Sequence, residues 1–498
     1  MSTGSRGRLV TLVVMIALVA AVAPVRAAST AAPVAFSSPA AFGAVELGRE
    51  VAFSLRGAGC AASRTHAQVR FGDQVVIGRT VRGCSGTVVL PSTAAVLAKG
   101  WREGTRLEIE LVSGARRVPL RHKHLEPDLG VPVSGTPTVV PADTDTQGDA
   151  NALAMTTGDV VDLGPVNLTG VYAIAVRSAG GGGYELRLGS ADGLVVAHGS
   201  SGFLASNISP PIPDWSIRRP GWTRNPWLLS TAPVAKAHPG ARHLFLAATS
   251  GASLFNFIDL TGSGVMAPYR RPPSLAGAHD LFNGKDLRGW KHVGDAGFVV
   301  KHGYMEAQEC PPNTDPTKFV ACIGFLYWTR KTYHDFHLRV DFSLTKFGDN
   351  GGVLIRHDAQ GDYQHAEEIQ LTDVNTEFVG GIDHVQEARR QPQSSPGQWS
   401  TMDIIAQGPR ILVAVNGIIT SLYDGTAGCG ITAQPCYGGA NGGYDQGGIG
   451  YVSMENEVGK VRFRDIEMYE CRGAHDPQCV TDDVDVLLPV PAVVPPLS

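Results

Sequence analysis

The chain has 498 residues and a formal net charge of -4, so its length suits about three domains of ordinary size. A net charge this close to zero favours neither a nucleic-acid partner nor an acidic interaction tail. We therefore expect no nucleic acid among its partners, and the sequence does not indicate an oligomeric state.

The N-terminus has the pattern of a secretory signal peptide over residues 1–28. Arg6 and Arg8 precede an apolar run from Leu9 to Val22, and small residues follow it. The run is shorter than the roughly 20 residues that a membrane-spanning helix needs, and no later segment is long and apolar enough to span a bilayer. We expect a secreted, extracellular protein without a membrane span.

The eight cysteines fall into four neighbouring couples. An even number in an exported protein favours disulfides. A zinc site is the alternative, but no Cys-x-x-Cys pair occurs. Connectivity does not follow from sequence, and sequential pairing is our hypothesis: Cys60 with Cys84, Cys310 with Cys322, Cys429 with Cys436, and Cys471 with Cys479. We expect no cofactor, with a structural calcium ion left open.

Short alternating runs recur between turns rich in Gly and Pro, and helical periodicity is almost absent. This pattern is typical of all-β sandwiches. We predict three β-sandwich domains in series: an immunoglobulin-like unit over 29–130, a second unit over 149–268 and a third over 279–472. Residues 131–148 and 269–278 are predicted linkers, and the Pro-rich tail 473–498 is predicted to be disordered.

The second unit contains VDLG, a Gly-rich hairpin, ELRLGSADG and LFNFIDL in that order. This order resembles family 6 carbohydrate-binding modules, although the acidic segment that often binds calcium in that family is not evident. The resemblance implies that Asn256 hydrogen-bonds a sugar. Trp222 and Trp227, near Trp215, are candidate stacking platforms because flat indole faces suit sugar C–H surfaces; core roles are the alternative.

The third unit contains the strongest strand patterns. Apolar and polar residues alternate without a fault in DFHLRVDFSL, which predicts a strand with one face in a core. In EEIQLTD, period-two alternation puts Glu368 and Gln370 on one face, and we expect Arg356 of NGGVLIRHD to leave the core on the same kind of face. With a hairpin turn at Asn416-Gly417, the unit is predicted to be a jelly-roll sandwich.

Several stretches of this unit resemble, in order and spacing, the secreted 3-keto-disaccharide hydrolase domain: HDLFNGKDLRGW, NGGVLIR, EEIQLTD, GQWSTMDIIAQGPRILVAVNG and GGIGYVSMENEVGKVRFRDIEMYE. The resemblance implies a concanavalin A-like sandwich that acts on 3-keto glycosides. The positions that match the family's motifs are Asn350, Gly352, Arg356, Glu368, Gln370 and Asp373, with Trp399 and Asn416 at positions that look structural.

Two stretches depart from the family pattern. Asp383 and His384 stand where the family often has an aromatic residue, and Ser453-Met454-Glu455-Asn456 replaces its usual acid-His-Gly. His384 is the candidate substitute for that histidine.

These residues suit elimination better than ordinary glycoside hydrolysis. A two-carboxylate mechanism is disfavoured because an amide takes the middle position of the Glu-x-Gln-x-x-Asp strand, and Asp373 has the wrong parity to share the face of Glu368. A carbonyl at C3 acidifies the hydrogen on C2 and lets the glycosidic oxygen leave C1, after which water adds. The roles we predict are Glu368 as base, Arg356 and Gln370 as oxyanion stabilisers, Asp373 or His384 as helper of the leaving group, and Asn350 as a substrate contact.

The same residues are compatible with three alternatives. Arg356 and Glu368 forming an ordinary surface salt bridge is one, and a non-catalytic lectin-like protein that binds polysaccharide through the same surface is another. A metal site at His357, Asp358, Asp362 and His365 is a third, although their spacing fits no defined site. The sequence thus predicts a carbohydrate partner and, as the first interpretation, a glycoside-cleaving hydrolase.

Overall fold

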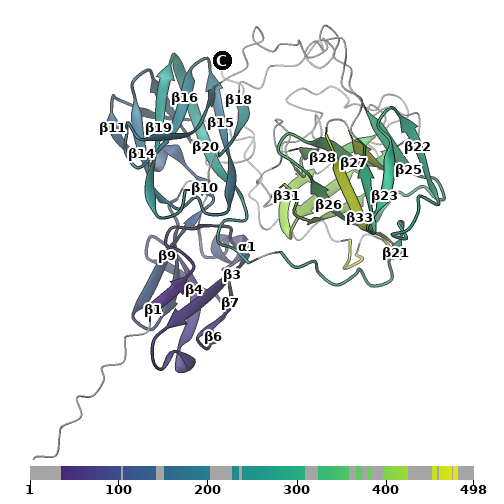
Figure 1. Ribbon diagram of the computed structural model, residues 1–498, viewed down its shortest axis with the longest axis horizontal. Helices are drawn as coiled ribbons and strands as arrows, with labels where there is room; N and C mark the ends of the chain where they lie inside the picture. Colours follow the sequence, from purple (N-terminus) through teal and green to yellow (C-terminus); the bar gives the residue numbers. More distant parts are fainter. Residues whose placement is uncertain are drawn as a thin grey trace, which may run out of the picture.

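The computed structural model describes most of the chain after residue 34. The described residues are 35–101, 105–141, 151–201, 227–234, 238–267, 269–308, 323–357, 366–372, 379–382, 388, 396–423, 451–456, 459–473 and 475–479. Within them the chain is almost entirely β, as predicted, and the strands form three successive sandwiches (Figure 1). None of the helices in this part of the chain is long and apolar enough to cross a membrane.

The first sandwich contains β1 (Ala35–Ser38), β2 (Ala44–Val45), β3 (Glu50–Arg56), η1 (Cys60–Ala62), β4 (Arg64–Phe71), β5 (Gln74–Ile77), β6 (Val81–Arg82), β7 (Ser85–Val89), α1 (Thr93–Leu97), β8 (Glu108–Ser113) and β9 (Arg116–His122). One sheet has the order β1-β3-β7, and the other has the order β2-β9-β8-β4-β5 with β6 paired to β4. Alternation places Val51, Phe53 and Leu55 of β3 in the core between them. The disulfide between Cys60 and Cys84 is one of the expected pairs.

The second sandwich contains β10 (His124–Leu125), η2 (Pro127–Leu129), β11 (Val131–Ser134), β12 (Thr138–Pro141), β13 (Asn151–Thr156), β14 (Val160–Val166), β15 (Val171–Gly180), β16 (Gly183–Leu188), β17 (Leu194–Ser200), β18 (Trp227–Pro233), β19 (Arg242–Ser250) and β20 (Ala252–Gly262). Its sheets have the orders β12-β13-β20-β15-β18, with β10 on β20, and β11-β14-β19-β16-β17.

The prediction of a linker over residues 131–148 is wrong for its first part. Strand β11 pairs with β14 and β12 pairs with β13, so both belong to the second sandwich. Each is the edge strand of its sheet, where a proline does not interrupt a ladder of hydrogen bonds. The prolines that suggested a linker are therefore compatible with strands here.

The first two sandwiches are in direct contact. Only one residue separates β9 from β10, which pairs with β20 of the second sandwich. At the other end of the second sandwich, Met266 returns to the core of the first and bridges Val51.

The third sandwich contains β21 (His279–Asp280), β22 (Trp290–Gly294), β23 (Phe298–Lys301), β24 (Tyr304–Ala307), β25 (Gly324–Trp328), β26 (Phe336–Leu344), β27 (Asn350–His357), β28 (Glu367–Thr372), β29 (Ser400–Gln407), β30 (Arg410–Val415), β31 (Ile418–Tyr423), β32 (Tyr451–Asn456) and β33 (Val461–Glu470). An eight-stranded sheet has the order β23-β24-β33-β26-β29-β30-β31 with β21 on β33, and a five-stranded sheet has the order β22-β25-β32-β27-β28.

The apolar face of β26 lies in the core of this sandwich, as its alternation predicts. The hairpin between β30 and β31 turns at Asn416 and Gly417, which have φ values of 52° and 74°. This left-handed pair is the geometry expected for an Asn-Gly hairpin.

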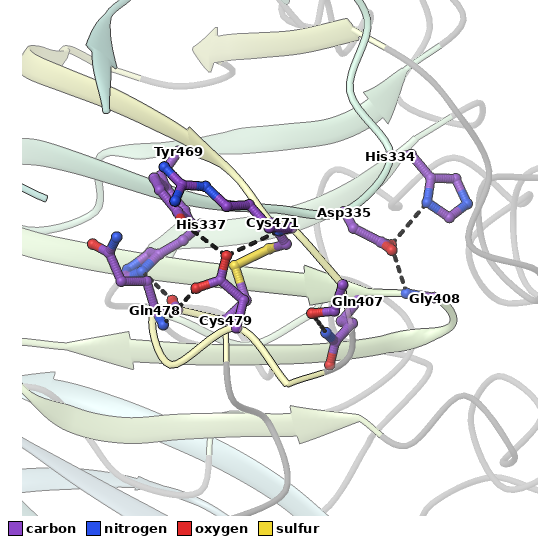
Figure 2. The surroundings of a disulfide bond; sticks show 12 residues. His334, Asp335, His337, Gln407, Gly408, Tyr469, Cys471, Gln478 and Cys479 are labelled. Atoms are coloured by element: carbon purple, nitrogen blue, oxygen red, sulfur yellow. Dashed lines mark hydrogen bonds and ion pairs between the residues drawn. A yellow bond between two sulfur atoms is a disulfide. The ribbon is translucent and has the colours of Figure 1, made fainter. Parts of the chain in front are cut away.

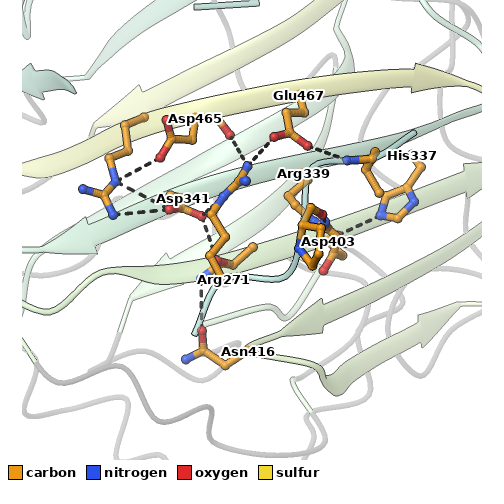
Figure 3. A network of polar contacts seen from close by, with 12 residues as sticks. Arg271, His337, Arg339, Asp341, Asp403, Asn416, Asp465 and Glu467 are labelled. Carbon is orange, nitrogen blue, oxygen red and sulfur yellow. Dashed lines mark hydrogen bonds and ion pairs between the residues drawn. The ribbon is translucent and has the colours of Figure 1, made fainter. Parts of the chain in front are cut away.

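The polar face of β26 is also buried, under a segment that the sequence predicts to be a linker (Figure 3). Arg271, within residues 269–278, donates to the carboxylates of Asp341 at 3.1 Å and Glu467 at 2.8 Å. Arg339 donates to Asp403 at 2.7 Å and to the Pro273 carbonyl at 2.8 Å. This segment therefore packs along the outer face of the eight-stranded sheet instead of connecting two domains freely.

The second disulfide of the described chain, between Cys471 and Cys479, follows β33 and is again an expected pair (Figure 2). Inside the small loop, Asp476 accepts a hydrogen bond from the Tyr469 hydroxyl at 2.7 Å, and His337 Nδ1 lies 2.8 Å from the Gln478 carbonyl. The prediction of a disordered tail from residue 473 therefore begins too early, because this loop is folded against β26 and β33.

Candidate functional site

The predicted pair of polar side chains lies on one face of the five-stranded sheet. Glu368 of β28 is opposite Leu354 of β27, and Gln370 is opposite Gly352. Directly opposed residues of an antiparallel pair share a face. A methyl group added at Gly352 would lie 2.5 Å from Glu368 Oε1, so the carboxyl group of Glu368 lies over this glycine.

Strand β27 contains a β-bulge just beyond this point. Leu354 is opposite Ser453 of β32, and His357 is opposite Tyr451. Strand β27 therefore advances by three residues where β32 advances by two. Arg356, inside the bulge, has a φ of 55°. One extra residue reverses the alternation of side chains. His357 consequently takes the face of Glu368, and Arg356 takes the opposite one.

The expectation that Arg356 shares a face with Glu368 is therefore wrong. Arg356 Nη2 donates to the backbone carbonyls of His334 at 3.2 Å and Gly408 at 2.6 Å. Its Nη1 lies 3.6 Å from Glu367 Oε1, and both of these side chains are fully buried. His334 precedes β26 and Gly408 connects β29 to β30, so Arg356 joins the two sheets of the sandwich. The arginine is not placed to stabilise an oxyanion beside Glu368.

A histidine and a tyrosine join Glu368 on its face instead. His357 is fully buried, and its Nε2 lies 3.2 Å from the hydroxyl of Tyr327 in β25. Their ring centroids are 4.7 Å apart, and Phe325 lies 5.7 Å from His357 on the other side. From the sequence, His357 is a candidate only as a metal ligand, because no residue type in NGGVLIRHD marks the bulge that reorients it.

The environment of this face is apolar. Phe325, Tyr327, Leu354 and Ala366 form a small hydrophobic cluster on it, while Glu368 is 6% exposed and Gln370 is 3% exposed. Electrostatic interactions are stronger in such a low-dielectric environment than in water. Asn350 pairs with Thr372 at the end of the same two strands, so this predicted substrate contact also lies on the face of Glu368.

Several predicted site residues lie outside the described residues: Asp373, His384, Trp215, Trp222 and the metal candidates Asp358, Asp362 and His365. The same holds for Cys310, Cys322, Cys429 and Cys436. Of Trp227 only the backbone is described, at the start of β18. In the part of the chain that the structure describes, no group of three or more His, Cys, Asp or Glu side chains is arranged to hold a metal ion.

Asn256 lies in strand β20 and not at a loop. Asn256 is 2% exposed. The amide oxygen accepts a hydrogen bond from Arg177 at 2.9 Å, and the amide nitrogen donates to the Asn151 carbonyl at 2.8 Å. Both ends of the amide are thus used inside the second sandwich, which argues against the sugar contact that the resemblance implies.

The comparison with protein families agrees with the resemblance found in the sequence. Residues 277–469 match the model of a family described as a 3-keto-alpha-glucoside-1,2-lyase-like domain. No curated protein matches the chain significantly.

Solved structures that resemble the chain include two described as putative glycosyl hydrolases from Parabacteroides distasonis. One is 17% identical with a TM-score of 0.30 and covers 39% of this chain and 94% of its own. The other is 20% identical with a TM-score of 0.31 and covers 39% and 98%. The carbohydrate-binding module CBM66 from Bacillus subtilis is 11% identical, with a TM-score of 0.24 and coverage of 36% and 96%. By its family match, the region of residues 277–469 is a domain similar to the 3-keto-alpha-glucoside-1,2-lyase-like family.

Proposed function

We propose that the third sandwich cleaves 3-keto-glycosides and that the whole chain is a secreted, carbohydrate-active protein. The observation that carries this proposal is the position of Glu368 over Gly352, on the same buried face as Gln370 and the pair formed by His357 and Tyr327. The family match to residues 277–469 supports the choice of substrate class. The two disulfides favour an oxidising compartment, in keeping with export.

In the proposed reaction Glu368 takes the proton from C2 of the 3-keto sugar. The electron pair of that C–H bond forms the enolate of the C3 ketone, and the amide N–H of Gln370 stabilises the enolate oxygen. The ketone then reforms as the C1–C2 double bond forms and the C1–O bond breaks. His357 and Tyr327 supply the proton to the departing oxygen. Water finally adds its hydroxyl group to C1, the remaining proton of the water returns to the pair formed by His357 and Tyr327, and Glu368 returns its proton to C2.

Each of these groups contributes a known type of catalysis. A positioned acid or base accelerates a reaction typically by about 10² to 10⁴-fold. A donor aimed at a developing oxyanion contributes a factor of about 10² to 10³. Arg356 has no part in this scheme, since it faces the other side of the sheet.

The decisive experiment measures aglycone release from a 3-keto-glucoside by the wild-type protein and by Glu368→Gln. We expect turnover by the wild type and a loss of at least about 10²-fold in the variant. Glu470→Gln, an exposed glutamate of the same sandwich that pairs with Lys331, is the matched control and should retain full activity. If Glu368→Gln released aglycone at the wild-type rate, Glu368 could not be the base.

The second candidate function is a non-catalytic lectin-like protein. Binding of the 3-keto-glucoside by the wild type without any release of aglycone would support that function.

For the second sandwich we retain the proposal that Trp222 and Trp227 bind carbohydrate. Its test is polysaccharide retention by a variant with alanine at both positions.

A further inference from the structure

A pocket lies between the first two sandwiches, at the passage from β9 to β10. Figure 1 shows where these two sandwiches meet. The cavity volume of the pocket is about 50 Å³ and its mouth is open to solvent, so it can admit an oxyanion group while the rest of a ligand stays outside. The first sandwich contributes Trp101, Arg106 and Arg121, and the second contributes Leu125 and Leu163. None of these residues takes part in the site of the third sandwich.

Two guanidinium groups converge on one side of this pocket. Arg121 reaches across from β9, and its Nη2 donates to the Leu163 carbonyl of β14 at 2.6 Å. A methyl group added at Gly164 would lie 3.4 Å from Arg106 Nη2 and 3.6 Å from Arg121 Nη1. The two arginines therefore approach the same glycine, and a methyl group there would be in van der Waals contact with both guanidinium groups.

Neither arginine has an anionic partner among the residues that the structure describes. The charge of Asp162 acts on Arg121, but Oδ1 of this carboxylate accepts from the Gly164 N–H at 2.7 Å and its Oδ2 lies 2.7 Å from His243 Nδ1. The buried Nε of Arg121 has no hydrogen-bond partner within the described chain. Burial and the neighbouring charge of Arg106 lower the pKa of Arg121 to about 10, against the opposing effect of Asp162, so the guanidinium is still charged at neutral pH.

The acidic groups around the pocket are occupied by its histidines. His124 lies 2.6 Å from Asp259 Oδ1 through Nδ1 and 3.1 Å from Glu126 Oε1 through Nε2. His122 Nε2 lies 3.3 Å from Glu46 Oε1. The buried Lys123 also lies close enough to Glu46 and Asp259 for their charges to act on it. Among the described residues, none of these carboxylates forms an ion pair with Arg106 or Arg121.

We propose that this pocket binds a small anionic ligand whose oxyanion group is held between Arg106 and Arg121. Guanidinium groups bind carboxylate and phosphate oxygens through paired N–H donors. A sugar acid such as a uronate and a sugar phosphate share this chemistry. The site is separate from the proposed cleavage site and does not depend on it.

The test is calorimetric titration of the full-length protein, at low ionic strength, with sodium glucuronate, glucose 6-phosphate and uncharged glucose. Arg106→Gln removes one exposed guanidinium, and Arg121→Lys keeps the charge but removes the paired donors. Because a hydrogen bond to a charged group contributes about 1.5–3 kcal/mol, each variant should weaken binding about 10- to 100-fold. Arg82→Gln removes an equal charge at an exposed position of β6, outside the pocket, and should leave the affinity unchanged.

The outcomes separate the sources of the ligand. Tighter binding of glucuronate than of the phosphate supports a carboxylate ligand, and the reverse order supports a phosphate ligand; each supports an oxyanion site. Glucose binding as tightly as both anions, no binding at all, or an unchanged affinity in Arg106→Gln would overturn the proposal. Glu368→Gln should bind the anions normally, and loss of anion binding in that variant would place the ligand in the third sandwich instead.

Discussion

The side chains of Arg356 and Glu368 leave neighbouring strands on opposite faces of one sheet. The bulge in β27 causes this separation and brings His357 to the face of Glu368. Arg356, with a φ of 55°, instead forms a buried ion pair with Glu367 between the two sheets. A position that matches the family's motif therefore has a structural role here that can be tested apart from catalysis.

Replacing Arg356 with methionine should mainly destabilise the third sandwich. The substitution leaves the carboxyl group of Glu367 buried without its guanidinium, and loss of one partner of a buried pair costs about 3–5 kcal/mol. Denaturant unfolding would measure this loss, and kcat measured well below the transition should change little. The double variant Arg356→Met with Glu367→Leu should recover part of the stability. Wild-type stability combined with a large fall in kcat would contradict this interpretation.

Gly352→Ala should impair cleavage of a 3-keto-glucoside. The new methyl group would lie 2.5 Å from Oε1 and 2.6 Å from Cγ of Glu368, so the proposed base must move away from its position. Misplacement of a reacting group by about 1 Å costs up to about 10²-fold in rate, and we expect a fall in kcat of roughly this size. Gly181→Ala is the control, because a methyl group at Gly181 meets no atom within 4 Å. Equal rates for the two variants would contradict the role of Glu368.

Tyr327→Phe should lower kcat and leave KM almost unchanged. The phenyl ring keeps its packing against His357, at a centroid distance of 4.7 Å, while the hydroxyl that lies 3.2 Å from Nε2 is lost. If the hydroxyl acts in proton transfer to the departing oxygen, a fall of about 10- to 10²-fold is expected. Tyr333→Phe is a matched control, since Tyr333 is equally buried but bonds His279 elsewhere in the sandwich. An effect of the same size in the control would identify a structural role.

Much of the fold follows from local pattern, and the errors have physical causes. Period-two alternation in β26 and β28 and the Asn-Gly turn after β30 are all visible in the sequence and found in the structure. The bulge is not visible, because its left-handed residue is an arginine and not a glycine. Alternation alone also cannot distinguish a polar face that meets water from one covered by another segment. Residues 270–275 cover such a face on β26.

Arg271→Gln should loosen the segment that covers β26. It removes the donor shared by Asp341, whose side chain is 2% exposed, and Glu467. Leaving a buried acceptor without its partner costs about 1–3 kcal/mol. We expect lower stability of the third sandwich and faster chymotrypsin cleavage near Leu275. Arg270→Gln is the control, because Arg270 is its exposed neighbour. Unchanged cleavage in Arg271→Gln would show that the other contacts suffice to hold the segment.

The stability of the first two sandwiches should fall as pH rises from 7 to 8. Burial opposes the charge of His124, but Asp259 and Glu126 outweigh it and raise the pKa of His124 to about 10 from 6.5. The folded state therefore holds this proton through a range in which the unfolded state has released it. The stability that this proton contributes is fully present below the pKa of His124 in the unfolded state. It is lost as the pH rises towards the pKa of His124 in the folded state, and the slope of the free energy of unfolding approaches about 1.4 kcal/mol per pH unit.

The neighbouring lysine acts in a different range. Burial lowers the pKa of Lys123 to about 8, so its contribution changes mainly above pH 8 and has the opposite sign. Between pH 7 and pH 8 the contribution of His124 therefore outweighs that of Lys123. In His124→Gln the decrease between the two pH values should largely disappear, whereas His243→Gln, which alters a more exposed histidine near Asp162, should keep it. A decrease of the same size in His124→Gln would assign the pH dependence to other groups.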